Sequence, residues 1–239
     1  MSKISRCILV IAAILCGSLP ALPTEIDPCF AFTPDADYAT NIIVMRKENR
    51  RVGLRVPVQY WEDYWDKRGG FEDYAQLFRV DMDDFTPVTR KQTSERLRSG
   101  RDNYMNFVAG DDNGPESWAL NFATPRDRTT RLTDLPPGQL SPAGLTWLDT
   151  EFSSVSRFPE EDLFVAYNAT DEVDSTIRCT SPKAPQTKKP MCSQYFRGGG
   201  LDVQMDYPRI FIHRWAELQH NTARFLQCSA VELPASEKD

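Results

Sequence analysis

The chain has 239 residues, of which 41% are apolar and 26% are charged. This balance is typical of a folded domain with a sizeable core and argues against global disorder. The formal net charge of -6 lacks the basic surplus that nucleic-acid-binding proteins usually carry, so we expect no nucleic-acid partner.

The N-terminus has the pattern of an export signal. Lys3 and Arg6 precede the apolar run CILVIAAILC, and the small, turn-prone segment GSLPALP follows. Ten apolar residues are too few to span a bilayer, which needs about 20. We therefore predict a signal peptide at 1–23, no stable membrane span, and a periplasmic protein. A lipoprotein modified at Cys16 is the second interpretation, which is disfavoured because Leu15 stands where a small residue is preferred.

Alternating apolar and polar residues predict several half-buried antiparallel strands in the first half of the mature chain. In RVGLRVPV, the residues Val52, Leu54 and Val56 share one face. The alternation of Trp118, Leu120 and Phe122 predicts another strand. In chain order, the predicted strands are 41–47, 51–58, 74–82, 103–110 and 117–124, with short helices at 58–67 and within 86–100.

The second half of the chain contains four more predicted strands and the strongest helix. The segment RGGGL predicts a tight turn that leads into the strand at 201–208. Pro208 then begins a helix predicted over 208–228. The tract at 132–145 is rich in Pro and Gly, so it is either a surface connection or a joint between two lobes. The other strands are predicted at 161–169, 175–181 and 192–198.

These elements predict the α+β class, with an antiparallel β-sheet covered by a C-terminal α-helix. We expect residues 24–239 to form one domain with one continuous sheet in two halves. Two lobes joined near 132–145 would fit the same pattern.

Four cysteines remain after removal of the signal peptide, and an even number in an exported chain suggests two disulfides. Of the three possible connectivities, the most local pairs Cys179 with Cys192 across a polar segment with three prolines. The remaining pair is then Cys29–Cys228. Free buried thiols are the alternative. No CxxC spacing indicates a zinc site.

Both histidines of the chain lie in HRWAELQH, within the predicted last helix. At 100° per residue, His213, Glu217, His220 and Arg224 share the side opposite the apolar stripe of Phe211, Trp215, Leu218, Thr222, Phe225 and Leu226. A row of His and Glu could bind a metal, but Arg224 adds a repelling charge and no further ligand is evident. We therefore interpret this row as a solvated helix face.

The sequence has no GxSxG, HExxH, Walker A or GxGxxG motif. The acidic segments VDMDDF and GDDNGPE do not follow the EF-hand pattern, and we expect turns there. We accordingly identify no catalytic, cofactor-binding or metal-binding residues and expect no enzyme activity and no cofactor. A glycosidase-like pair of carboxylates stays open because acidic residues are plentiful.

Two features suggest recognition of a protein partner. QYWEDYWDKR places Tyr60, Trp61, Tyr64 and Trp65 on one side of a short helix. Most of these rings would pack on the sheet, and one or two would be exposed for a partner. The second feature is a basic cluster, which is either a docking surface or a set of scattered solvated arginines. We select Trp61, Trp65, Arg96 and Arg98 as candidate partner-binding residues. The cluster comprises Arg90, Lys91, Arg96, Arg98 and Arg101, continued by Arg126, Arg128 and Arg131.

Two segments, LRVPVQYWEDYWDKRGGFEDYAQLFRVDMDDFTPVT and RCTSPKAPQTKKPMCSQYFRGGGLDVQMDYPRIFIHRWAEL, resemble a group of uncharacterised exported bacterial proteins. Some members of that group are associated with type VI secretion toxins as periplasmic immunity proteins. The resemblance implies a non-enzymatic periplasmic protein that binds a protein partner, namely a secreted toxin. Two alternatives remain open at this point, an envelope hydrolase that uses dispersed acidic residues and a structural component of the envelope.

Overall fold

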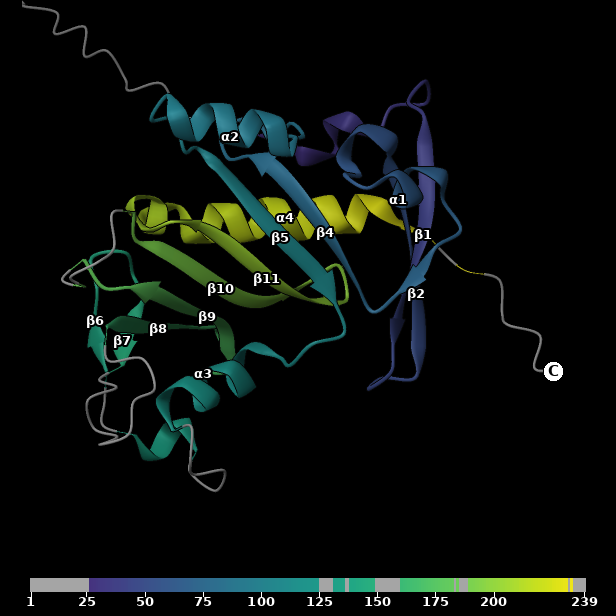
Figure 1. The fold of residues 1–239 in the computed structure, drawn as a ribbon. Helices are drawn as coiled ribbons and strands as arrows, with labels where there is room; N and C mark the ends of the chain where they lie inside the picture. Colours follow the sequence, from purple (N-terminus) through teal and green to yellow (C-terminus); the bar gives the residue numbers. More distant parts are fainter. Residues whose placement is uncertain are drawn as a thin grey trace, which may run out of the picture.

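The alternating segments form two β-sheets in the part of the chain that the structure describes (Figure 1). The structure is a computed structural model, and the residues that it describes are 26–124, 131–135, 138–148, 160–182, 184, 189–231 and 233. The segment predicted as a signal peptide, 1–23, lies outside these ranges. Within the described ranges, no helix is long and apolar enough to cross a membrane.

The larger sheet has eight strands in the order β4-β5-β11-β10-β9-β8-β7-β6, and all neighbouring pairs are antiparallel. Its strands are β4 (Ala75–Asp81), β5 (Tyr104–Gly110), β6 (Gln139–Leu140), β7 (Thr146–Leu148), β8 (Glu161–Tyr167), β9 (Val173–Thr180), β10 (Met191–Gly198) and β11 (Leu201–Pro208). The tract at 132–145 contributes η3 (Leu132–Asp134) and the strand β6, which pairs with β7 at one edge.

The smaller sheet has four strands in the order β12-β2-β1-β3, in which only β1 and β3 pair in parallel. It consists of β1 (Tyr38–Met45), β2 (Arg50–Pro57), β3 (Glu72–Asp73) and β12 (Ala230–Val231). The expectation of one continuous sheet was therefore wrong. Leu54 and Val56 of β2 are fully buried in the same core as the large sheet, so the hairpin packs on that core instead of extending the sheet edge.

The last helix, α4 (Trp215–Ser229), lies behind the large sheet and reaches the small one (Figure 1). Most of its apolar stripe is buried as expected, since Leu218, Phe225 and Leu226 have no exposed surface. Trp215 and Phe211 are half-buried, and Phe211 precedes the helix. The ring of Phe225 lies 5.0–5.9 Å from five other aromatic rings, namely those of Phe32, Tyr60, Phe78, Phe85 and Phe107. This aromatic cluster joins α4 to β4 and β5 of the large sheet and to η2 (Val58–Tyr60), the segment directly after β2. The fold is α+β with an antiparallel sheet covered by the C-terminal helix.

The predicted helix at 208–228 begins later than expected. Pro208 ends β11, and a 3-10 segment, η5 (Arg209–Arg214), precedes α4. Trp215 donates a hydrogen bond from Nε1 to the carbonyl of Ala143 at 3.0 Å, which attaches the start of α4 to the loop before β7.

The segment SWALNFAT is a helix and not the predicted strand. It lies in α3 (Pro115–Ala123), with Pro115 in the first turn. Residues four apart, Trp118 with Phe122 and Ala119 with Ala123, pack together on the outer face of β8–β10. Trp118 and Phe122 of the alternating set therefore lie on a helical stripe, of which Leu120 is not a part.

The other short helices are η1 (Pro28–Ala31), η2 (Val58–Tyr60), α1 (Tyr64–Arg68) and α2 (Arg90–Arg98). A capping box between Thr89 and Gln92 begins α2, and Gly100 follows its end with a φ of 72°. The turn in RGGGL also needs glycine: Gly199 has a φ of 59°, and a Cβ there would lie 2.6 Å from Leu226 Cβ.

Both cysteine pairs expected from the sequence lie at disulfide distance. Cys179 and Cys192 are direct partners across β9 and β10, with Cα atoms 4.0 Å apart. Cys29 in η1 pairs with Cys228 near the end of α4, with Cα atoms 5.9 Å apart. The second pair closes a separation of 199 residues and fixes the start of the described chain to α4.

Candidate protein-binding surface

The aromatic segment after β2 divides into a buried half and an exposed half. Tyr60 and Trp61 are 3% and 1% exposed, whereas Tyr64 and Trp65 are 66% and 62% exposed. Trp61 packs on Phe78 and donates its indole N–H to the Val56 carbonyl, so its selection as a partner-binding residue was wrong. The division arises because the backbone is extended at positions 61 and 63, which separates η2 from α1 and turns the second pair of rings outward.

A buried asparagine holds the exposed half in place. Asn41 of β1 has no exposed surface, and its Nδ2 donates to the Asp66 carbonyl at 2.9 Å. Its Oδ1 accepts from the Phe71 amide at 3.1 Å. The Gly70 amide adds a 2.7 Å bond to the Thr40 carbonyl. These contacts fix the 64–73 segment along β1, so its aromatic side chains are exposed on a rigid backbone.

Four exposed aromatic residues occupy this segment and its continuation, Tyr64 and Trp65 in α1 and Phe71 and Tyr74 around β3. Phe71 and Tyr74 are 43% and 44% exposed. The rings of Tyr64 and Trp65 meet edge to face at 5.4 Å. We call these four side chains, together with the carboxylates of Asp63, Asp66 and Asp73, the α1–β3 surface. Large aromatic groups that are held rigidly yet exposed are typical of protein-binding sites.

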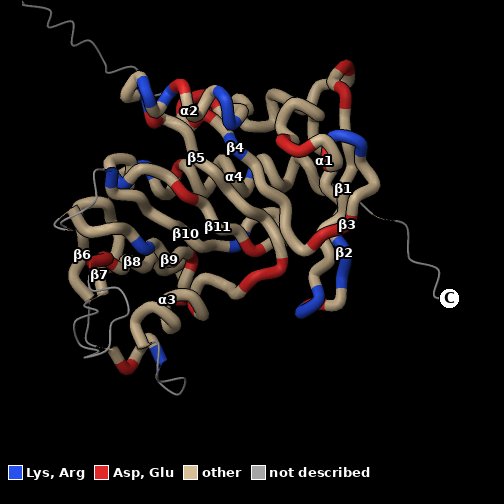
Figure 2. Tube along the Cα trace, viewed as in Figure 1, with Lys and Arg blue, Asp and Glu red and all other residues tan. Residues whose placement is uncertain are grey.

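The three carboxylates outnumber the two basic side chains of α1, Lys67 and Arg68, so the surface carries a small local negative charge. Among the described residues none of them forms an ion pair, although Asp73 accepts a hydrogen bond from the Tyr74 amide. Burial raises the pKa of Asp66, and the neighbouring charges of Asp63 and Asp73 raise it further. Figure 2 shows acidic positions in red around α1 and β3.

Glu62 connects the α1–β3 surface to α2, and its own charge is neutralised by ion pairs. Its carboxylate pairs with Arg79 at 2.6 Å and with Arg90 at 2.9 Å. The start of α2 therefore lies next to the segment that leads into α1.

The two arginines selected on α2 have different surroundings. Arg96 forms an ion pair with Asp81, whose side chain is only 9% exposed, at 2.5 Å. This arginine anchors α2 to the end of β4. Arg98 is exposed and donates to the Ser94 carbonyl within its own helix. Of the rest of the basic cluster, Arg126 and Arg128 lie outside the described residues. Arg131 directly precedes η3, which contacts α3, and α3 lies far from α2 in Figure 1.

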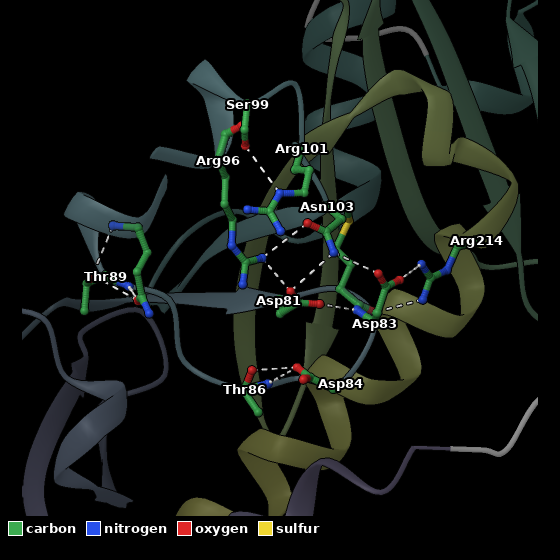
Figure 3. Close-up of polar contacts among 12 residues, drawn as sticks. Asp81, Asp83, Asp84, Thr86, Thr89, Arg96, Ser99, Arg101, Asn103 and Arg214 are labelled. Atoms are coloured by element: carbon green, nitrogen blue, oxygen red, sulfur yellow. Dashed lines mark hydrogen bonds and ion pairs between the residues drawn. The ribbon is translucent and has the colours of Figure 1, made fainter. Parts of the chain in front are cut away.

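The acidic loop VDMDDF forms a network with basic and amide groups (Figure 3). Asn103 donates to Asp83 at 2.8 Å, and Arg214 donates to the other oxygen of Asp83 at 2.8 Å. The Asn103 hydrogen bond, followed by that of Arg214, lowers the pKa of Asp83. The Asp83 amide in turn donates to Asp81. These bonds stabilise a turn through its side chains. Through Arg214, the last residue of η5, they also attach the segment directly before α4 to the β4–α2 connection.

The row predicted on the outer side of the last helix is exposed, as expected, although His213 lies in η5, before α4 begins. His213, Glu217, His220 and Arg224 are all exposed. Glu217 pairs with Arg214 at 2.7 Å. Within the described ranges, no group of three or more His, Cys, Asp or Glu side chains could hold a metal ion.

The carboxyl groups with a raised pKa lie on separate elements. Burial is the main cause of the raised pKa at Asp66 on α1, Glu161 on β8 and Asp202 on β11. Asp202 receives the Asp112 amide and pairs with Arg197, and Glu161 pairs with Arg178. The three groups are thus distributed over the fold and do not form one acid–base pair.

Comparisons with known proteins identify the fold. No protein-family model matches the chain, and no curated protein matches its sequence. The structure is similar to that of Smlt3025, an immunity protein of the Stenotrophomonas maltophilia type IV secretion system, with a TM-score of 0.58 and 14% identity. The alignment covers 82% of this chain and 95% of that one. A second solved structure, the iron-regulated outer membrane lipoprotein FrpD of Neisseria meningitidis, aligns with a TM-score of 0.41 and 12% identity, covering 87% and 96% of the two chains.

The chain thus shares the fold of a secretion-system immunity protein. Of the four residues selected as partner-binding, the structure leaves Trp65 and Arg98 exposed, uses Arg96 in an ion pair, and buries Trp61. Sequence reasoning did not select Phe71, Tyr74 or Asn41. The one available signal for them was the density of aromatic and acidic residues in FEDY, directly after Gly69 and Gly70.

Proposed function

We propose that this protein is a periplasmic immunity protein, a non-enzymatic binding protein that neutralises a secreted bacterial toxin by direct contact. The observation that carries the proposal is the shared fold with Smlt3025 over 95% of that protein's length. Two further features support it: the cysteine pairs suit an oxidising compartment, and a rigid, exposed aromatic surface suits protein recognition.

We further propose that the toxin is delivered by a type VI secretion system, as the sequence resemblance implies. Smlt3025 belongs to a type IV system. The two origins differ in a measurable way, because each delivery system can be inactivated separately in the attacking strain. Protection that is needed only against attackers with an intact type VI apparatus would support this assignment.

The function is tested with the toxin encoded beside this gene, produced in the periplasm of a sensitive host. We expect the full chain, with its signal, to restore growth and the purified mature chain to bind the toxin directly. A version without residues 1–23 should not protect, although it should contain the same binding surface. Growth inhibition that is unchanged by the exported chain, together with no measurable complex, would refute the proposal.

A further inference from the structure

Resting on the proposed function, we infer that the α1–β3 surface is the docking site for a cationic protein segment, one that presents Arg and Lys side chains to it. The surface differs from the rest of the described chain because two large aromatic rings there are each more than 60% exposed on a backbone fixed by buried hydrogen bonds. The inference concerns both the place of contact and the chemistry of the partner.

The aromatic side chains supply the contact area. Tyr64 and Trp65 lie edge to face, and both side chains stay largely exposed to solvent. Because Asn41 fixes the backbone beneath them, little backbone freedom is lost when a partner binds. Trp and Tyr are also the residue types most often found at energetic hot spots.

The charges favour a cationic occupant. Residues 62–74 contain five acidic and two basic side chains. Glu62 and Glu72 are already paired with arginines of this chain. Asp63, Asp66 and Asp73 then stand against Lys67 and Arg68 of α1, so three acidic and two basic side chains leave a net charge of -1. An incoming cation would relieve the mutual repulsion of the three carboxylates, whereas an anionic or neutral segment would not.

The rings already receive cations from within the chain. The guanidinium of Arg68 lies 5.8 Å from the centroids of both Tyr64 and Trp65, at the outer limit of a cation–π contact. Arg46 lies much closer to Tyr74, at 3.5 Å from its centroid. The surface thus already accommodates guanidinium groups against its rings, and we expect it to prefer Arg over Lys in a partner because Arg also stacks through its plane.

The arginines of α2 repel a cationic segment at the α1–β3 surface only weakly. Arg90 and Arg96, which lie on the side toward α1 and the sheet, are each paired with a carboxylate of this chain. Arg98 and Arg101 lie at the far end of α2, beyond the pair that Glu62 makes with its first turn.

The probe for this inference is a capped octa-arginine peptide, compared with octa-lysine and a neutral Gly-Ser peptide of equal length. The mature, oxidised protein is titrated while its amide resonances are followed by NMR. We expect octa-arginine to shift amides at 63–74 and in the adjoining β1, and to bind at least about threefold more tightly than octa-lysine.

Two variants test the two parts of the surface, and each has a matched control. Tyr64→Ala with Trp65→Ala should weaken octa-arginine binding about tenfold. The control, Leu140→Ala with Ile210→Ala at apolar positions that are at least as exposed, should leave it unchanged. Asp63→Asn with Asp66→Asn and Asp73→Asn should weaken it by a similar factor. The control for this triple variant, with the same change in net charge, is Asp35→Asn, Asp37→Asn and Asp171→Asn.

The outcomes separate this inference from the proposed function. Shifts that fall elsewhere, or equal weakening by the surface triple and its control, would show non-specific attraction to an acidic protein and overturn the docking site. Failure of the exported chain to protect against the toxin would overturn the immunity function, even with peptide binding intact. Once a toxin that this protein neutralises is identified, both surface variants should fail to protect the host cell, and both control variants should still protect it.

Discussion

Asn41 is the residue on which the rigidity of the α1–β3 surface depends, and Asn41→Ala tests that dependence. The substitution removes the bond to the Asp66 carbonyl and the bond from the Phe71 amide. Each is worth about 1 kcal/mol net, so opening of the 64–73 segment should become easier by about 2 kcal/mol. This corresponds to an opening equilibrium that is about 30-fold more favourable.

The assay is hydrogen exchange of backbone amides in the native protein. The Gly70 amide, bonded to Thr40, and the Ile42 amide, bonded to the Phe71 carbonyl, report opening of the segment from β1. We expect both to exchange about 30-fold faster in Asn41→Ala, because local opening exposes them without global unfolding. Amides of β10 and β11, in the centre of the large sheet, should be unaffected.

The control is Asn113→Ala, which removes an exposed amide side chain bonded to Lys47. It should leave exchange at Gly70 and Ile42 unchanged. If Asn41→Ala also left both rates unchanged, the segment would be held by other contacts and the argument for a rigid surface would fail. A uniform acceleration over both sheets would instead mean that Asn41 acts on global stability.

Phe225→Ala should lower the free energy of unfolding by about 3–5 kcal/mol in chemical denaturation, because it leaves a cavity among five aromatic rings. Asp66→Asn should raise the melting temperature of the free protein at pH 7. The pKa of Asp66 is higher in the folded than in the unfolded state, so at a pH above both values the ionised carboxyl destabilises the fold. That gain should disappear as pH falls below about 4, where the wild-type carboxyl is protonated in both states. Replacing His213 and His220 by Gln should leave melting temperature and toxin protection unchanged, since both lie on the solvated face; a large loss of either would revive a functional role for this row.

The strands could be predicted from the sequence because alternation is a local signal. Seven of the predicted strands correspond to β1, β2, β4, β5, β8, β10 and β11, and the segment around Cys179 corresponds to β9. The segment at 117–124 was mispredicted because Trp118 and Phe122 fit both periods, and the deciding contacts with β8–β10 are remote in sequence. Pro115 after Gly114 was a local sign of a helix start that the alternation obscured.

The candidate site was predictable only in outline. A single helix over 58–67 would place Trp61 and Trp65 on one side, and this reasoning failed because the chain is extended between η2 and α1. Arg96 is used in an ion pair with Asp81, fifteen positions earlier, and the two become neighbours only when α2 folds back over β4. Asn41 lies in an ordinary-looking strand, and its role depends on a segment 25–30 residues away.

The raised pKa of Asp66 links the stability of the free protein to recognition of a partner. A chain under selection for stability alone would replace this aspartate, because Asn would bury no charge and would not be repelled by Asp63 and Asp73. In a complex with a cationic segment the carboxylate becomes favourable, because the incoming positive charge offsets the repulsion among Asp63, Asp66 and Asp73. The same substitution should therefore stabilise the isolated protein and weaken the complex. Opposite signs in the two measurements would distinguish a binding carboxylate from one that is merely tolerated at the surface.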